Sequence, residues 1–87
     1  MKIKIRKFGE ILTSRPAGRE AALATKAYLR LQPDEKIELD FSDVLSVGPS
    51  WLDEFLSLLK QEYGKERILC LPSDNPSVNR SLEVIQE

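Results

Sequence analysis

The chain has 87 residues, of which 41% are hydrophobic and 31% are charged, and its net charge at pH 7 is −1. This length and composition are typical of one folded domain, so we expect a single domain over residues 1–87 and exclude a disordered chain. The chain shows no apolar run of the roughly 20 residues that a membrane helix needs, no signal peptide and only one cysteine, so we expect a cytoplasmic protein without a membrane partner.

The first segment is predicted to be a β-hairpin. Apolar and basic residues alternate strictly in KIKIRK (2–7), and this two-residue period is typical of a strand with one buried face. Gly9 can adopt the dihedral angles of a tight turn, and EILT (10–13) can return as a short second strand.

A helix is predicted over residues 14–31, where the hydrophobic period lengthens to between three and four residues. We expect Ser14 to be its N-cap, Pro16 to lie in its first turn and Pro33 to end it. Gly18 lowers its helix propensity by about 1 kcal/mol relative to alanine. The apolar stripe of this helix is formed by Ala17, Ala21, Ala24, Tyr28 and Leu31.

The segment KIELDF (36–41) alternates again and is predicted to be a second long strand. Its outward residues, Glu38 and Asp40, are acidic, whereas the outward residues of the first strand are basic. If the two strands are neighbours, Lys4 and Arg6 can face these carboxylates across the sheet. We therefore expect one face of the sheet to be covered by helices and the other to be exposed to water.

A second helix is predicted to begin at Ser50 and to end at Gly64. The sequence SWLD fits a capping box in which Ser50 is the N-cap and Asp53 is the third helical residue. RILCL (67–71) is an unbroken apolar run, which predicts a strand buried on both faces. A last helix follows Asn75, and its apolar stripe is formed by Val78, Leu82 and Ile85.

The order of these elements predicts an α/β domain with a largely parallel, four-stranded sheet, three helices mainly on one face and an N-terminal β-hairpin. In such a domain every helix starts above the carboxyl edge of the strands, where ligands and partners usually bind. The segments 14–19, 40–51 and 73–76 are therefore expected to meet at this edge.

Little in the sequence indicates catalysis. The chain has no histidine and a single cysteine, Cys70, so the commonest general base and metal ligand are missing. Gly9 and Gly18 do not form a phosphate loop, and the apolar run around Cys70 offers no charged, exposed setting for a reactive thiol. We therefore expect a non-enzymatic domain without a metal, a cofactor or a nucleic-acid partner.

Arg15 is expected in the first turn of a helix, where a cation meets the positive end of the helix dipole and is mildly unfavourable. One interpretation is an ion pair with Asp40 or Asp43 across the same edge of the sheet. The alternative is that Arg15 and Arg19, one turn later, receive an anion, which is either a phosphate or the carboxylate of a partner.

Ser50 also has two interpretations. As an N-cap it explains the serine, the preceding proline and Asp53 together. As a phosphoacceptor it would hold its phosphate at the favourable end of the helix dipole, but close to Asp53, whose charge repels the phosphate.

The segment IELDFSDVLSVGPSWLDEFLSLL resembles the strand–loop–helix core of STAS domains (sulfate transporter and anti-sigma-factor antagonist), and more closely a small bacterial STAS-like family of unknown function. That family carries a serine–arginine opening to its first helix, an aspartate–aromatic pair at a strand end and a PSFADE-type loop. The matching elements here are Ser14 with Arg15, Asp40 with Phe41, and PSWLDE (49–54), and LCLPSDNPSV also resembles the family's last strand and helix start.

The resemblance implies a non-enzymatic regulatory domain of bacterial signalling. Relatives in the anti-sigma-factor antagonist branch dock on an ATP-binding kinase of the histidine-kinase-like type and are controlled by serine phosphorylation in this loop. Where those relatives usually carry the phosphoacceptor, this chain has Pro49, so Ser50 is the candidate phosphoacceptor here.

Two functions follow for testing. The first is a non-enzymatic regulatory domain that docks on a histidine-kinase-like ATPase or a similar partner, with partner switching as one option. Its partner surface is formed by Ser46, Gly48, Ser50, Trp51, Asp53, Arg15 and Arg19. The second is a sensing domain in which the helix starts near Arg15 bind a small anion, such as a nucleotide phosphate.

Overall fold

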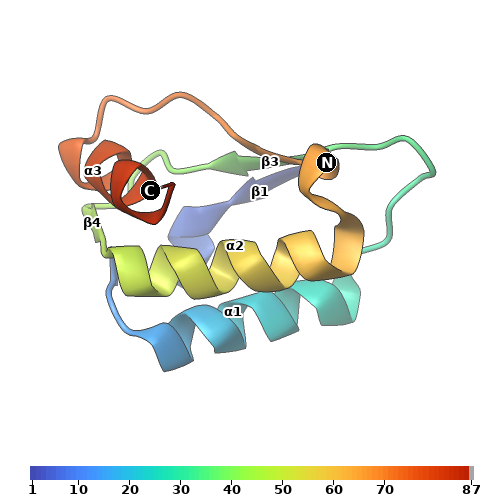
Figure 1. The fold of residues 1–87 in the computed structure, drawn as a ribbon, viewed down its shortest axis with the longest axis horizontal. Helices are drawn as coiled ribbons and strands as arrows, with labels where there is room; N and C mark the ends of the chain where they lie inside the picture. Colours follow the sequence, from blue (N-terminus) through green and yellow to red (C-terminus); the bar gives the residue numbers. More distant parts are fainter. Residues whose placement is uncertain (87) are drawn as a thin grey trace.

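The computed structural model describes residues 1–86. Its strands are β1 (Lys2–Lys4), β2 (Ile11–Leu12), β3 (Ile37–Asp40), β4 (Ser46–Val47) and β5 (Ile68–Cys70). Its α-helices are α1 (Arg15–Tyr28), α2 (Pro49–Tyr63) and α3 (Pro76–Ile85), and short 3-10 helices are η1 (Ile5–Phe8) and η2 (Lys65–Arg67) (Figure 1). No helix in this part of the chain is both long and apolar enough to cross a membrane.

The strands form two sheets, and the pairing in both is parallel. β1, β3 and β5 lie side by side in that order, whereas β2 pairs with β4 in a separate two-stranded sheet. The α/β class and the parallel pairing are thus confirmed, but the single four-stranded sheet is wrong. After β1 and again after β3, the chain leaves the larger sheet and contributes its next strand to the smaller one.

The predicted N-terminal hairpin does not form. After β1 the chain winds into η1, and Gly9 turns it onward with a φ of +135°. β2 then runs parallel to β4, with Ile11 opposite Ser46 and Leu12 opposite Val47. Because this pairing buries Leu12 and Val47 together in the core, β2 lies beside β4 instead of returning along β1.

One face of the three-stranded sheet is open to solvent, as expected. Lys2 lies opposite Glu38 and Lys4 lies opposite Asp40, so basic and acidic side chains alternate across β1 and β3. Arg6 lies in η1, outside this ladder, which corrects its expected position beside β3.

β5 is the outer strand of the sheet on the side away from β1. Ile68 points into the core and is 8% exposed, whereas Leu69 is 44% exposed. The prediction that this strand is buried on both faces is therefore wrong. An apolar run alone does not distinguish a central strand from an edge strand whose second face is uncovered.

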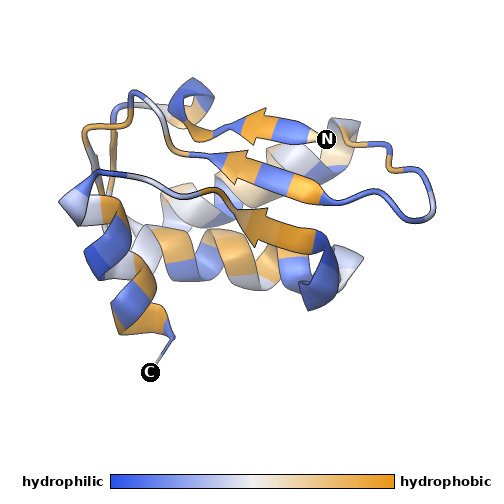
Figure 2. Ribbon diagram, turned by 90° about the horizontal axis from the view of Figure 1, so that it is seen from above, coloured by the Kyte–Doolittle hydropathy of each residue, from blue (hydrophilic) through white to orange (hydrophobic). Residues whose placement is uncertain are grey.

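The helices cover the opposite face. In Figure 1, α1 and α2 run side by side beneath the sheet, and α3 lies at one end beside β4. Figure 2 looks onto the open face, with the strands in front of the helix layer. The core between the layers contains large, fully buried side chains from η1, β3, β4 and α2, which include Ile5, Ile37, Leu39, Val47, Trp51, Leu52, Phe55 and Leu59.

α1 begins as predicted, but the face that it buries differs from the predicted one. Ser14 is its N-cap, and the Ser14 hydroxyl accepts a hydrogen bond from the N–H of Ala17 (3.2 Å). The helix ends at Tyr28, five residues before Pro33. Its buried residues are Gly18, Ala21, Ala22 and Thr25, so most of the predicted alanine stripe lies outside the core.

Gly18 explains this orientation. A Cβ at this position would lie 2.4 Å from the carbonyl oxygen of Trp51, so the backbones of α1 and α2 touch where the helices meet. Thr25 can be buried on the same face because its hydroxyl donates to the carbonyl oxygen of Ala21 (2.9 Å). The buried face of a helix is predicted from the spacing of its apolar residues, and glycine and threonine are not counted among them. The exposed alanines therefore indicated the wrong face of α1.

α2 begins one residue before Ser50, so the predicted capping box is wrong. Gly48 is the N-cap, Pro49 is the first helical residue, and no side chain caps the helix. The fixed φ of proline suits the first helical position, which explains the shift. Gly64 ends the helix with a φ of +94°, as predicted.

α3 begins as predicted, with the Asn75 side chain accepting from the N–H of Ser77 (2.8 Å). Two of its serines also bind the main chain of Val47 in β4. The Ser77 hydroxyl accepts from the Val47 N–H (2.9 Å) and donates to its carbonyl oxygen (3.0 Å), and the buried Ser81 hydroxyl donates to the same oxygen (2.6 Å). These hydroxyls occupy the edge of β4 that faces away from β2.

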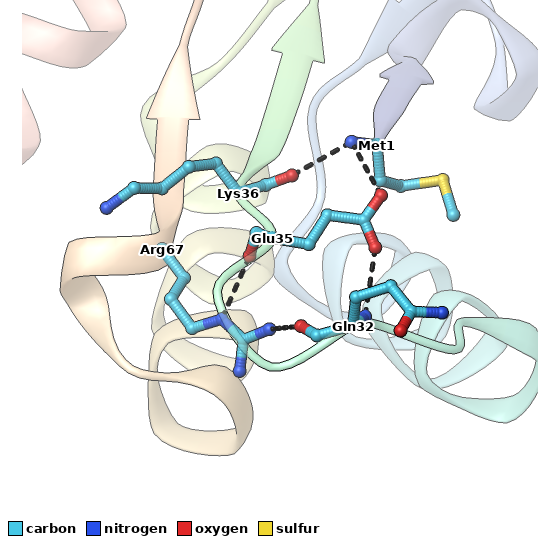
Figure 3. A network of polar contacts seen from close by, with 5 residues as sticks. All are labelled: Met1, Gln32, Glu35, Lys36 and Arg67. Carbon is cyan, nitrogen blue, oxygen red and sulfur yellow. Dashed lines mark hydrogen bonds and ion pairs between the residues drawn. The ribbon is translucent and has the colours of Figure 1, made fainter.

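A polar network connects the amino ends of β1, β3 and β5, the strands of the three-stranded sheet (Figure 3). The amino group of Met1 contacts the Glu35 carboxylate (3.2 Å) and the carbonyl oxygen of Lys36 (3.0 Å). Arg67 donates to the carbonyl oxygens of Glu35 (3.0 Å) and Gln32 (2.8 Å). The N–H of Gln32 donates to the Glu35 carboxylate and, together with Met1, lowers the pKa of that carboxyl.

Candidate protein-interaction site

The three segments expected at the carboxyl edge of the strands do meet there. The Asn75 side chain, just before α3, donates to the carbonyl oxygen of Val44 (2.7 Å) in the loop between β3 and β4. The N–H of Gly48, just before α2, donates to the carbonyl oxygen of Leu12 (2.7 Å), close to the start of α1. Residues far apart in the chain therefore build one continuous surface.

Arg15 binds two carboxylates of α2. Its guanidinium lies 3.0 Å from the carboxylate of Asp53 and 3.1 Å from that of Glu54, and these hydrogen bonds raise the pKa of Arg15. The predicted ion pair with Asp40 or Asp43 is thus wrong in its partners. α1 and α2 start side by side, so their first turns face each other and Arg15 reaches the carboxylates of α2.

The contact between α1 and α2 continues along both helices as a row of ion pairs. Arg19 lies 3.6 Å from Glu54, and Lys26 lies 3.3 Å from Glu62. The arginines are more than half exposed, so water screens these pairs and each contributes little to stability. The row leaves charged groups of both signs available on the surface.

Ser50 is exposed in the first turn of α2. It lies in a shallow hollow of about 410 Å³ between the starts of α1 and α2 and the end of α3. The residues that line this hollow are Arg15, Pro49, Ser50, Asp53, Val84 and Ile85. Ser50 and Arg15 therefore share one opening at the positive end of the α2 dipole, where an anionic group is favoured.

The other residues predicted for this site stabilise the fold instead of forming the surface. Trp51 is 1% exposed and stacks on Phe55 with ring centroids 4.9 Å apart, so it belongs to the core rather than to a partner surface. Ser46 is half-buried, with its hydroxyl 3.3 Å from that of Ser77. Gly48 caps α2. Ser46 and Gly48 hold the loop in place beside the hollow.

Two surface residues of this site were missed by the sequence reasoning. Glu54 follows Asp53 in the PSWLDE motif and pairs with both Arg15 and Arg19, so the motif itself carried the signal. Val84 is 43% exposed and lines the hollow from α3. No pattern in the sequence singled out Val84, because it lies off the apolar stripe of its own helix.

Cys70 lies away from this surface. It is half-buried at the end of β5, and burial raises the pKa of its thiol, although Lys60 acts weakly in the opposite sense. A raised thiol pKa lowers the thiolate fraction at neutral pH, which agrees with a packing role rather than a nucleophilic one.

A family model described as a STAS-like domain of unknown function (DUF4325) matches residues 24–77, which is more than half of the chain. The chain belongs to this family. The match confirms the resemblance seen in the sequence, and the matched part of this STAS-like domain runs from the second half of α1 to the start of α3. Searches of curated proteins and of solved structures gave no significant match.

Proposed function

We propose that this STAS-like domain is a non-enzymatic regulatory domain that docks on a histidine-kinase-like ATPase. The docking rim consists of Arg15, Arg19, Ser50, Asp53, Glu54 and Val84. The observation that carries the proposal is the shared hollow, in which an exposed serine at a helix start lies beside an arginine held by two carboxylates. A partner can replace these ion pairs with its own charged groups without unfolding the domain.

The composition of the docking rim supports a protein partner. Interfaces combine a small apolar centre with charged groups at its edge, and arginine is enriched in them. Here Val84 supplies exposed apolar surface, and Arg15 and Arg19 supply side chains that bind carboxylates in a fixed geometry.

The alternative of a small-anion sensor has weaker support. Both arginines near the helix starts already contact carboxylates, so a free anion would have to displace Asp53 and Glu54 before it could bind. A protein partner brings several contacts at once and offsets this cost more easily than a single phosphate.

Ser50 gives the docking rim a candidate switch. A phosphate on its hydroxyl would be favoured by the α2 dipole and would compete with Asp53 and Glu54 for Arg15. The same phosphate would be repelled by Asp53. We propose that phosphorylation of Ser50 in this way rearranges the ion pairs of the docking rim and releases the partner.

The docking proposal is tested by calorimetric titration of the domain against each purified histidine-kinase-like ATPase of the source organism. We expect one of them to bind and Arg15→Glu to weaken binding at least about tenfold, because the reversed charge opposes the partner at the rim. Arg30→Glu, two residues beyond the C-terminal end of α1, is the matched control and should bind normally. If no ATPase binds, while phosphate or a nucleotide alone raises the melting temperature, the sensor alternative replaces the proposal.

The switch is tested separately by intact mass spectrometry after incubation with the ATPase that binds and with ATP. We expect the mass of one phosphoryl group to be added to the wild type and not to Ser50→Ala. An unmodified wild type removes the switch but leaves the docking proposal standing.

A further inference from the structure

α1 presents an apolar face that the rest of the described chain leaves uncovered. Ala17 and Ala24 are exposed, and Tyr28 is 48% exposed, although these residues form most of the apolar stripe of the helix. In Figure 1, α1 is the outermost helix, with α2 on one side of it. The core uses a different face, centred on Gly18 and Thr25, so the stripe is left for another role.

This face forms one wall of a groove. The groove has a volume of about 400 Å³ and runs between α1 and the segment 8–13. Its alanine side is formed by Ala17, Ala21 and Ala24, and its opposite wall contains Phe8 and Ile11. Ile11 is 65% exposed, which is a large exposure for an isoleucine in a strand. We call this feature the alanine groove.

The side chains along this face of α1 change in size from one end to the other. The first half carries Ala17 and Ala21, which leave room for a neighbour, whereas the face ends in the bulky, exposed Tyr28. An identical helix packed in the same direction would place tyrosine against tyrosine. Packed in the opposite direction, it would place each tyrosine over the alanines of the other copy, which is the better steric fit.

The charged groups on this face favour the same antiparallel arrangement as the side-chain sizes. Glu20 lies beside the alanines, and the amino group of Lys7 lies 4.2 Å from the centre of the Tyr28 ring and also contacts its hydroxyl. Positions 20 and 28 are eight residues apart, or about 12 Å along the helix. Neither Glu20 nor Lys7 forms an ion pair within residues 1–86. An antiparallel copy would bring each Glu20 to the Lys7 of the other chain.

We propose that the alanine groove is the interface of a symmetric dimer, in which the α1 helices of two copies pack antiparallel about a two-fold axis near Ala24. Size and charge select the same arrangement independently, and a two-fold axis forms each Glu20–Lys7 contact twice. The docking rim remains free, because Arg15 and Arg19 lie on the edge of α1 that faces α2. The dimer therefore does not depend on the proposed ATPase partner.

Charge exchange tests this interface in the purified, full-length chain. By sedimentation equilibrium from micromolar to millimolar concentrations, we expect the wild type to reach twice the monomer mass. Glu20→Lys and Lys7→Glu should each weaken dimerisation at least about tenfold, because like charges then face each other. An equimolar mixture of the two variants should dimerise again, since all contacts between unlike chains are then attractive, and so should the double variant.

Two further variants separate the groove from the rest of α1. Ala24→Arg places two cations at the two-fold axis and should give a folded monomer, as checked by circular dichroism. Leu23→Arg is the matched control, because Leu23 is 45% exposed and is not part of the groove, and it should leave the dimer intact. A wild type that stays monomeric at millimolar concentration overturns the proposal, as does a dimer that tolerates both single charge reversals.

Discussion

Gly18 allows the main chains of α1 and α2 to come into contact. A side chain there would meet main-chain atoms of Trp51, which cannot move aside as a flexible side chain would. We predict that Gly18→Ala destabilises the domain by about 1–3 kcal/mol, although alanine is the better helix former by about 1 kcal/mol. Urea unfolding followed by circular dichroism measures this difference.

The control is the same substitution at Gly48. A Cβ there would lie 3.6 Å from Thr13, which is an ordinary contact distance. Gly48→Ala therefore adds no steric strain and should cost less than about 1 kcal/mol, from the weaker N-cap. Equal losses for the two variants would show that the contact between α1 and α2 is looser than described.

Two serines at helix starts should behave differently when they are changed to alanine. Ser14 caps α1 through its hydroxyl, so Ser14→Ala should lower the free energy of unfolding by about 1 kcal/mol. Ser50 caps nothing, so Ser50→Ala should change it by less than about 0.5 kcal/mol. A large loss at Ser50 would restore the capping interpretation and remove the reason to regard its hydroxyl as available.

For single residues, the sequence predicts those roles that depend on only a few neighbouring residues of the chain. Ser14 and Asn75 cap their helices as expected, because a cap is formed within three residues of the chain. Ser50 was misplaced because Pro49 also suits a helix start. The partners of Arg15 were wrong because they depend on how two helices pack, which no local pattern encodes.

At the scale of the elements, α3 is attached to β4 by the hydroxyl groups of two of its serines. Ser77 and Ser81 satisfy both main-chain groups of Val47 at the free edge of β4. We predict that the double change Ser77→Ala with Ser81→Ala costs about 1–3 kcal/mol for each Val47 group left unpaired. In this double variant, amide hydrogen exchange should be accelerated more in α3 than in α2.

Ser57→Ala serves as the control for α3, because Ser57 is exposed on α2 and should be neutral within about 0.5 kcal/mol. If the double variant is as stable as the wild type, water replaces both hydroxyls and α3 depends on its apolar contacts alone.

The existence of the elements was easier to predict than their faces and pairings. All three helices occur where the hydrophobic period indicated them. The buried face of α1 could not be read from apolar residues, because it is built around Gly18 and a threonine whose hydroxyl is satisfied within the helix. The two-residue strands β2 and β4 are too short to carry a period, so their pairing had no signal.

For the whole molecule, the network at the amino ends of the strands makes stability depend on pH. The N–H of Gln32, and then the amino group of Met1, hold the pKa of Glu35 below its ordinary value of 4.5. This stabilisation is complete above about pH 4.5 and is lost as the pH falls through the lower value of the folded state. We predict that the melting temperature falls in this acid range and falls less for Glu35→Gln.

Asp34→Asn provides the control, since Asp34 is a neighbouring exposed carboxylate that takes no part in the contacts of the network. Some acid sensitivity should remain in Glu35→Gln, because hydrogen bonds from Ser42 also lower the pKa of Asp40. An unchanged pH profile in Glu35→Gln would mean that the network contributes no stability in solution.

The close meeting of α1 and α2 limits how this molecule can transmit information. Where main chain rests directly on main chain, there is no side chain that can change rotamer to let one helix slide past the other. We therefore expect the two helices to resist sliding past each other at this point. For the proposed regulatory role, we therefore expect the message to be conveyed by what is bound to the domain, and not by a change in its own shape.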